Sequence, residues 1–379
     1  MKIRTNSNWE ILKDITAYAL WHRQMNRDLY KDVNWQDIFA LAKQQTVQCL
    51  ALDGLNAAMA EYPWWKDEGY PGIGEDLAMD WTGQQLTTTR RNARINEAIG
   101  KVCGKLNEAH VRYAVMKGQV CASLWPEPMH RVSGDVDLAI HTDDYQKAVD
   151  LFEKLGAVKG DGAEFKHLVY TLDKIPWELH FSVHRFGQKR LQRTMDQWVN
   201  EDLSYPQQRR ITIYNNVKVP VFSPDLEIVH LLLHFVQHII HEGCGMRQLV
   251  DFALVLQDNL NKIVVLPLLD QIEALQLTRA FHVVLYLCQS VLGIPLPPLV
   301  RACFVPKGYT ALEKKLARKI EQRMMTDGNF GHSTGWTKPK GLWGSASYNL
   351  RSWRREITFI PLWPKETLLF PWEVITRRI

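Results

Sequence analysis

Cysteines and long apolar stretches are scarce in this sequence of 379 residues. The six cysteines lie far apart without a Cys-x-x-Cys pair, a spacing that fits neither a disulfide framework nor a zinc site. No stretch approaches the ~20 apolar residues that a membrane span needs, and the N-terminus carries no apolar segment typical of a signal peptide. We therefore expect a cytoplasmic protein with buried free thiols and no membrane partner.

An excess of one charge sign is also lacking. The chain has 46 basic and 41 acidic residues, for a formal net charge of +5 at pH 7. Proteins that bind long nucleic acid are usually much more basic, so we expect no such partner. A smaller phosphate-bearing ligand is compatible with this charge. Hydrophobic residues make up 46% of the chain, as in ordinary globular proteins.

The residue patterns divide the chain into four regions. Apolar residues recur at helical spacing in the first and third regions, whereas β-rich runs alternate with helical segments in the second. This order predicts an α/β (α+β) fold, with a small mixed β-sheet core flanked by N- and C-terminal helical regions. The predicted regions are 1–110, 111–222, 223–325 and 326–379.

The expected elements can be bounded by residue. Asn34 and Ser7 are candidate helix N-caps, and Pro63 and Pro71 separate helices. Helices are expected at Trp9–Leu20, Trp35–Leu55, Ile73–Glu108, Asp144–Leu155, Pro224–His241, Arg247–Leu256, Val265–Leu275, Ala280–Val291 and Leu312–Met325. Strands are expected at Val111–Met116, Val136–Ile140, His167–Leu172, Trp177–Val183 and Val217–Phe222.

The last region is rich in tryptophan and arginine. We expect it to be a mostly irregular tail that packs on the core through its aromatic side chains. The alternative is a nucleic-acid surface that combines stacking with positive charge. The residues concerned include Trp343, Trp353, Arg354, Arg355, Trp363 and Trp372.

Two carboxylates mark the start of a predicted strand. Asp135 and Asp137 are two residues apart, so on a strand they project from the same face, about 6–7 Å apart. Like charges at this distance repel unless a cation lies between them. Carboxylates so arranged, beside apolar Val136 and Leu138, predict a magnesium site.

A glycine follows an earlier predicted strand. Gly118 comes after Met116 and precedes a helix-like segment, Gln119–Leu124. Such a turn lets the backbone approach phosphate oxygens, and the following helix N-terminus offers free N–H groups. Lys117 adds a positive charge at this phosphate site.

A third acidic position lies on a later strand. Glu178 and His180 share one face of Trp177–Val183 by the period of two. Glu178 completes a carboxylate triad if this strand lies beside Val136–Ile140. For His180 two interpretations stay open, as a partner of a carboxylate or as a packed residue of the sheet.

Together these motifs resemble the nucleotidyltransferase superfamily of the DNA-polymerase-β type, and most closely its little-characterised bacterial branch. The resemblance covers roughly residues 10–260, and the superfamily's usual Gly-Ser turn is Gly118-Gln119 here. The branch also has a His-rich helix and an Arg-x-x-x-Asp segment. The matching blocks are Lys117-Gly118, Arg131-x-x-Gly134-Asp135-x-Asp137, Glu178-x-His180, His230–His241 and Arg247…Asp251.

The resemblance implies a metal-dependent enzyme. It would move a nucleoside monophosphate from an NTP, with ATP as the first choice, to an acceptor hydroxyl by a two-magnesium mechanism. The implied catalytic residues and metal ligands are Asp135, Asp137 and Glu178. The implied nucleotide-binding residues are Lys117, Gly118, Gln119, Arg131, His180, His238 and Arg247. A small molecule, a protein side chain and an RNA end all remain open as acceptors, and the sequence does not identify a protein partner.

Other functions also remain open at this stage. The Gly118-Gln119 turn lacks the serine hydroxyl that normally touches the nucleotide phosphates, which favours a catalytically inactive nucleotide-binding module. A toxin-type transferase that modifies tRNA or a partner protein would share the same motifs. For Arg247 and Asp251, the alternative to a nucleotide contact is an ordinary ion pair at i, i+4 on one helix.

Four histidines fall on one face of the predicted helix that ends at His241. Zinc would need imidazoles that converge on one point, whereas a helix offers two at i, i+4. We therefore expect the helix to pack beside the active site, with one or two histidines facing the nucleotide. These histidines are His230, His234, His238 and His241.

Overall fold

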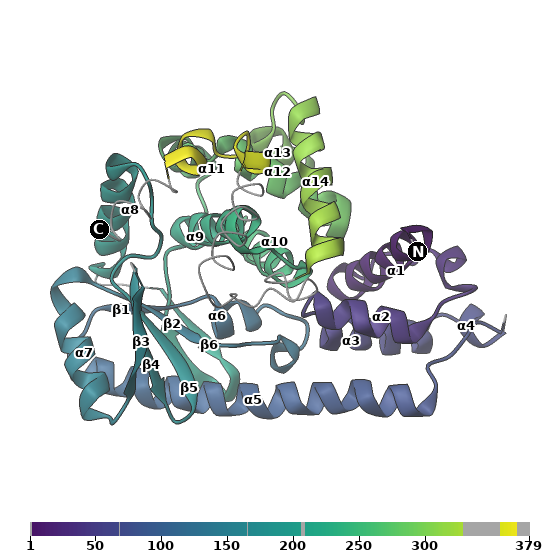
Figure 1. The fold of residues 1–379 in the computed structure, drawn as a ribbon, viewed down its shortest axis with the longest axis horizontal. Coiled ribbons are helices and arrows are strands. Elements are labelled where there is room, and N and C mark those ends of the chain that lie inside the picture. The colour runs from purple at the N-terminus through teal and green to yellow at the C-terminus, as the bar shows by residue number, and fades with distance from the viewer. Residues whose placement is uncertain (1, 68, 165, 206–208, 329–356, 370–379) are drawn as a thin grey trace, which may run out of the picture.

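The computed structural model describes residues 2–67, 69–164, 166–205, 209–328 and 357–369. A five-stranded mixed sheet lies against helices from both ends of the chain (Figure 1). This arrangement confirms the predicted fold class. Among the described helices, none is both long and apolar enough to cross a membrane.

The sheet has the strand order β1-β2-β5-β4-β3. β2 (Val136–Ile140) carries the predicted Asp137. It is antiparallel to β1 (Tyr113–Met116) and parallel to β5 (Ile175–His180). β4 (His167–Leu172) is antiparallel to β5 and to β3 (Val158–Glu164). The parallel pairing of β2 with β5 brings two distant motifs of the sequence side by side.

A separate two-stranded sheet consists of β6 (Arg210–Ile213) and β7 (Val217–Pro220). β7 contacts both β1 and the long helix α5 (Glu75–Glu108). The hairpin therefore extends the apolar core beneath the larger sheet. Of the two strands, only β7 was predicted from the sequence.

The two faces of the large sheet belong to different hydrophobic clusters. Val136, Leu138 and Ile140 of β2 pack with residues of α5 and α7 (Tyr145–Lys154). Ala139 instead packs in the cluster formed by the other helices. Successive side chains of a strand point to opposite faces, so Asp137 lies on the same face as Ala139. The predicted carboxylates therefore lie on the face that packs against those helices.

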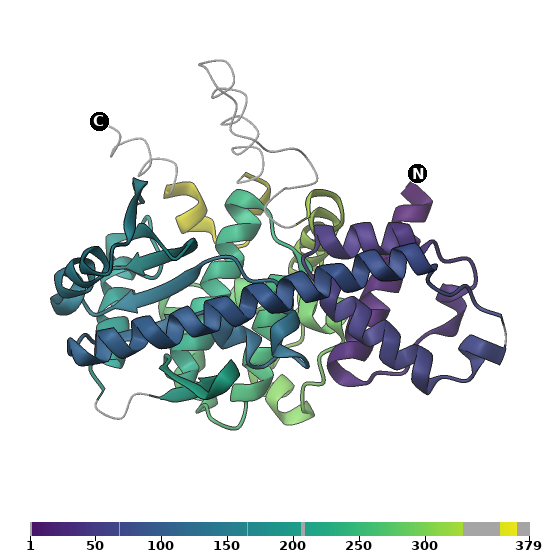
Figure 2. The same ribbon diagram turned by 90° about the horizontal axis from the view of Figure 1, so that it is seen from below.

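α5 runs along most of the molecule, beneath the sheet and the N-terminal helices in Figure 1 and in front of them in Figure 2. Its 34 residues give a length of about 51 Å. Ile99 and Val102 pack on the sheet, whereas Trp81 near the other end is fully buried and donates a hydrogen bond to the Gln48 carbonyl at 2.7 Å. The helix therefore joins two parts of the molecule, and the predicted division into four regions stays a prediction.

The N-terminal helices differ from the prediction in three places, one of which is the short helix Trp64–Asp67, which was not predicted. The single helix expected at Trp35–Leu55 is wrong, because Thr46 has φ +55° and interrupts it. Asn34 is an N-cap, as predicted, since its side chain accepts from the Gln36 N–H at 3.0 Å. Ser7 is not an N-cap, because it lies inside a helix that begins at Lys2. The helices are α1 (Lys2–Trp21), α2 (Trp35–Gln44), α3 (Gln48–Glu61) and α4 (Trp64–Asp67).

The helices that follow the sheet form the layer above it in Figure 1. α9 and α10 pack against each other, and α10 contacts the short helix α6 beside the sheet. Helices α8 and α13 and strand β3 were not predicted. α6 (Gly118–Ala122) lies between β1 and β2 in the chain. The helices that follow the sheet are α8 (Lys189–Leu203), α9 (Pro224–Gln237), α10 (Met246–Asn259), α11 (Val265–Ala274), α12 (Thr278–Leu287), α13 (Pro298–Phe304) and α14 (Ala311–Asp327).

Only part of the predicted tail is described. Trp363 is buried and packs edge-to-face on Phe186 and beside His184. Glu366 accepts hydrogen bonds from the backbone N–H groups of Gly187 and Gln188. This part of the tail is therefore anchored on the core. The other residues named for the tail, Trp343, Trp353, Arg354, Arg355 and Trp372, lie outside the described residues.

Candidate active site

Three carboxylates meet where the start of β2 runs beside β5. In the parallel register Asp137 lies directly opposite Glu178, which meets the condition set by the sequence. One oxygen each of Asp135, Asp137 and Glu178 lies within 4.8 Å of the others. Asp137 is buried, Glu178 is partly buried and Asp135 is exposed. The cluster therefore has one open side, through Asp135.

Two side chains offset part of this negative charge. The Lys117 ammonium lies 2.8 Å from Asp137 Oδ1, and His180 Nε2 lies 2.9 Å from the same oxygen. His180 Nε2 is also 3.1 Å from Glu178 Oε2. His180 thus contacts both carboxylates, which agrees with the interpretation that it is their partner.

The pKa values of Asp137 and Glu178 respond differently to these surroundings. Burial alone would raise the pKa of Asp137, but the Lys117 charge and the His180 hydrogen bond outweigh it and hold the pKa well below its usual range. Burial raises the pKa of Glu178, and the nearby Asp137 charge adds to this. Asp137 is thus ionised at neutral pH, whereas Glu178 takes up a proton more readily.

The turn before α6 has an unusual backbone. Lys117 has φ +51° and ψ −136°, and Gly118 has φ +36°. For a residue other than glycine this region costs on the order of 1–3 kcal/mol and is found mostly at functional sites. This backbone conformation places the Lys117 side chain against Asp137 and leads the chain directly into α6.

Gln119 faces the interior. Its side chain is buried and donates from Nε2 to Asn92 Oδ1 at 3.0 Å. Asn92 in turn donates to the carbonyls of Met129 and Arg131, each at 2.8 Å. Gln119 therefore ties the turn to α5 and to the loop that leads to Asp135. The sequence did not identify Asn92, which is an isolated polar residue within a long helical pattern.

Arg131 is buried, and its guanidinium group donates hydrogen bonds to two neighbouring side chains. Its Nε and Nη2 donate to the two carboxylate oxygens of Asp251 at 2.8 and 2.7 Å, and Nη1 donates to Ser133 Oγ at 3.1 Å. Trp125 Nε1 donates to the same carboxylate at 3.0 Å. Burial would lower the pKa of Arg131, but the Asp251 charge outweighs it and raises the pKa. This pair ties the loop before β2 to α10.

The alternative interpretation, an ion pair of Arg247 with Asp251, is wrong, because Asp251 pairs with Arg131 instead. The predicted nucleotide contact of Arg247 stays a prediction. Arg247 Nη1 donates to the Val132 carbonyl at 2.7 Å. Burial and the neighbouring Arg131 charge lower the pKa of Arg247 to about 10, so the guanidinium is charged at neutral pH.

Three of the predicted residues line one small cavity between the loop and the helices. Lys117, Arg131 and Arg247 come from three separate segments and bring three cations to it. The cavity has a volume of about 20 Å³, which is room for a single water molecule. Its walls are Lys117, Arg131, Leu231, His234, Phe235, Arg247, Gln248 and Asp251.

The histidines of α9 lie beside this cavity without gathering at one point. His234 lines the cavity, and the predicted His238 stacks edge-to-face on it with ring centroids 4.4 Å apart. Burial, with the nearby Lys117 charge, lowers the pKa of His230 and of His234 well below the usual range. Among the described residues, no candidate metal-ligand group includes a histidine of α9.

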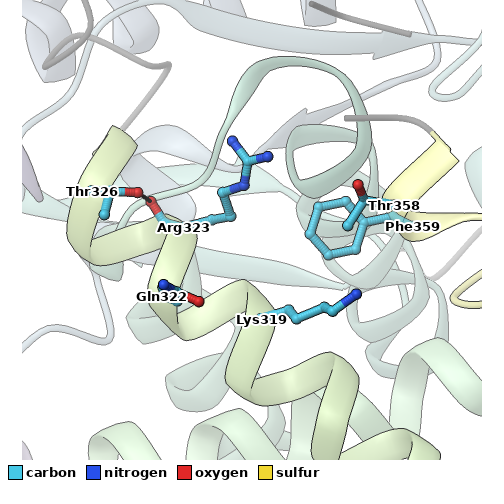
Figure 3. A pocket seen from close by; sticks show the side chains of 6 residues that line it. All are labelled: Lys319, Gln322, Arg323, Thr326, Thr358 and Phe359. Atoms are coloured by element: carbon cyan, nitrogen blue, oxygen red, sulfur yellow. Dashed lines mark hydrogen bonds between the residues drawn. The ribbon is translucent and has the colours of Figure 1, made fainter. Parts of the chain in front are cut away.

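A larger pocket of about 280 Å³ lies between α14 and the segment that contains Phe359 (Figure 3). Lys319 and Arg323 give it positive charge, and the Phe359 ring forms one wall. No predicted site residue is among the described residues that line it, which are Lys319, Gln322, Arg323, Thr326, Thr358 and Phe359.

A mixed sheet carries Asp137 and Glu178 on two neighbouring strands, with Asp135 directly before β2 and a Lys-Gly turn beside them, which agrees with the nucleotidyltransferase fold expected from the sequence. Residues 31–293 match the family model of uncharacterised nucleotidyltransferases, and the chain belongs to this family. Among curated proteins, none matches the sequence. A comparison with solved structures finds a similarity to an antigenic nucleotidyltransferase-like protein from Paracoccidioides brasiliensis. The two sequences are 19% identical, the match covers 48% of this chain and 91% of that chain, and the TM-score is 0.31.

Proposed function

We propose that the protein transfers a nucleoside monophosphate from an NTP to an acceptor hydroxyl, in a reaction that depends on divalent metal ions. The observation that carries the proposal is the pairing of Asp137 with Glu178 across β2 and β5, with Asp135 at the open side. Membership of a nucleotidyltransferase family supports the reaction class. ATP is our first choice of donor.

The donor set suits magnesium. Three carboxylate oxygens within 4.8 Å of one another form a hard, all-oxygen group of the kind that binds Mg²⁺ together with phosphates and water. Asp135, Asp137 and Glu178 would hold two such ions. When bound, magnesium supplies positive charge for the transferring phosphoryl group and for the acceptor oxygen.

Several side chains would act directly on the reactants. Lys117 and Arg247 would supply positive charge for the phosphates of the donor, and the backbone at Gly118 would approach these phosphates. Glu178, the partly buried acid of the cluster, would accept the acceptor's hydroxyl proton. The acceptor oxygen forms the new bond to the α-phosphorus, the bond to the bridging oxygen breaks, and pyrophosphate leaves.

Other residues would position this machinery. His180 contacts both Asp137 and Glu178 and would fix their orientation. Arg131, held by Asp251, would fix the loop that carries Asp135. The loop then presents Asp135 at the open side of the cluster, where donor and acceptor enter.

One observation favours a second candidate function, a nucleotide-binding module without turnover. The Gln119 side chain is buried on Asn92, so the turn offers no side-chain hydroxyl or amide to the phosphates. In that case the protein would bind NTP with metal but release no pyrophosphate.

The test is nucleotide transfer by the full-length protein. ATP, GTP, CTP and UTP labelled in the α-phosphate are incubated with Mg²⁺ and with small-molecule, RNA or protein fractions of a cell extract. We expect pyrophosphate release and label transfer with one fraction, both lost in Asp137→Asn and kept in Asp270→Asn, which changes an exposed carboxylate of α11. Binding of NTP without release in any fraction would favour the binding module, and neither binding nor release would rule out both functions.

A further inference from the structure

A second group of potential metal ligands adjoins the carboxylates. The antiparallel register of β4 and β5 places His167 directly opposite His180, and Glu178 is two residues before His180 on the same face. Both imidazole rings are buried, with centroids 4.6 Å apart. One ligand atom each of His167, Glu178 and His180 lies within 4.8 Å of the others.

The spacing of these atoms suits a metal ion. Glu178 Oε2 is 3.1 Å from His180 Nε2 and 3.5 Å from His167 Nδ1. A tetrahedral ion with bonds of about 2.0–2.1 Å has its ligand atoms ~3.3 Å apart. The two measured distances lie on either side of this value, so small side-chain movements would suffice for coordination.

The donor atoms set the class of metal. Imidazole nitrogen suits zinc, cobalt and other transition metals, whereas magnesium prefers oxygen ligands throughout. The carboxylate triad offers only oxygen, and the second group offers two nitrogens and one oxygen. Glu178 belongs to both groups, which is the relation expected of a carboxylate that bridges two neighbouring ions.

We propose that His167, Glu178 and His180 bind a divalent transition-metal ion. This nitrogen-containing site lies beside the all-oxygen magnesium site and shares Glu178 with it. The inference rests on the proposed function only through that shared carboxylate. Three protein ligands leave a fourth position open on the ion, as in catalytic rather than structural zinc sites.

The competing account is a hydrogen-bond network without metal. His180 Nε2 lies within hydrogen-bond distance of both Asp137 and Glu178, and one proton on this nitrogen could link the two carboxylates. The two accounts differ in the role of His167. A proton shared among His180 and the carboxylates does not require it, whereas the metal site does.

The test is a cobalt titration of the full-length, chelator-treated protein in excess Mg²⁺. We expect one Co²⁺ per chain with visible d–d absorption, and displacement by Zn²⁺. His167→Gln should weaken binding by at least ~10-fold, while His110→Gln, at an exposed histidine, should leave it unchanged. Displacement of Co²⁺ by Mg²⁺, seen as loss of the d–d absorption, would overturn the proposal. Unchanged affinity for Co²⁺ in a folded His167→Gln protein would overturn it as well.

Two further measurements keep the result unambiguous. In proton NMR of the cobalt-loaded wild-type protein, we expect two paramagnetically shifted imidazole N–H resonances, which identify two histidine ligands. A thiolate-to-cobalt charge-transfer band in the absorption spectrum would instead assign the ion to a cysteine, such as the exposed Cys303, and would contradict the site. Asp135→Asn removes a ligand of the oxygen site only. Cobalt binding retained in this variant, whether or not ATP binding is present, separates the metal proposal from the proposed function.

Discussion

Two groups of charged side chains lie on the same side of the sheet, one buried and one with an open side, and their charges are balanced differently. Arg131 and Asp251 form a closed pair with two parallel hydrogen bonds, supported by Trp125 and Ser133. The carboxylate cluster has three acids, and Lys117 is the cation that pairs directly with Asp137. A closed pair holds a structure together, whereas an excess of negative charge at one point is suited to binding cations.

The largest effect on stability should come from opening the closed pair. Asp251→Ala leaves the Arg131 guanidinium buried without its counter-ion, and breaking such a pair costs about 3–5 kcal/mol. Urea unfolding of the variant measures the loss. The double variant Arg131→Met, Asp251→Leu removes both charges and should recover much of it. Equal stability of Asp251→Ala and wild type would show that the pair is not structural.

The carboxylate cluster should behave in the opposite way. Asp135→Asn removes the exposed one of three repelling acids and leaves the Lys117–Asp137 ion pair intact, so we expect a free energy of unfolding equal to or above that of wild type. The same change should weaken Mg²⁺ binding by at least ~100-fold, since a lost ligand charge is worth several kcal/mol. Isothermal calorimetry and urea unfolding together check both parts. A large loss of stability with normal Mg²⁺ binding would reverse the comparison.

A buried histidine near the tail sharpens the comparison through pH. Burial, with the Lys166 and His241 charges, lowers the pKa of His184 from 6.5 to about 3. Below pH 6.5 the unfolded chain therefore binds a proton at His184 that the folded protein does not bind. The contribution of neutral His184 to the free energy of unfolding is complete above pH 6.5 and is lost as the pH falls towards 3. His184 alone should make the protein about 1.4 kcal/mol less stable at pH 5.5 than at pH 7.5.

Urea unfolding at these two pH values measures the difference. His184→Phe should reduce it, and His110→Gln, at an exposed position, should not. An unchanged difference in His184→Phe would assign the pH dependence to other groups.

The smallest effect should come from the turn before α6. Gly118 has φ +36°, and a Cβ added there would lie 3.6 Å from the Asp135 carbonyl oxygen, an ordinary contact. Gly118→Ala should therefore cost only the backbone penalty, on the order of 1 kcal/mol. Thermal unfolding measures this, with Gly83→Ala in the interior of α5 as a control that should not destabilise. A cost well above this value would mean that the turn tolerates no side chain.

The sequence predicted the carboxylate cluster because its signals are local. Asp135 and Asp137 are two residues apart at the start of a strand, and Glu178 carries the same period of two. Their assembly depended on one assumption, that the two strands are neighbours, and the register of β2 and β5 confirms it. The roles of these residues in catalysis stay predictions.

The position of His167 could have been found from the same sequence. Asp173 and Lys174 form a two-residue turn with φ of +53° and +63°, which pairs Leu172 with Ile175. This pairing fixes the register and places His167 opposite His180. The turn was missed because two-residue turns of this kind are usually signalled by Asn-Gly or Asp-Gly.

The Arg131–Asp251 pair could not have been found in this way. The two residues are 120 positions apart, and neither a period nor a turn relates them. Only the packing of α10 beside α6 brings them together. β3 was missed for another reason, because its sequence VKGDGAE contains two glycines and lacks the alternation that marks a strand.

The most direct test of the central claim is calorimetry of ATP binding with and without Mg²⁺, on wild type, Asp137→Asn and Asp270→Asn. If the carboxylates form a cation-dependent nucleotide site, wild type and Asp270→Asn bind ATP only when Mg²⁺ is present, and Asp137→Asn does not bind it. ATP binding that is independent of Mg²⁺, or that survives in Asp137→Asn, would contradict the account.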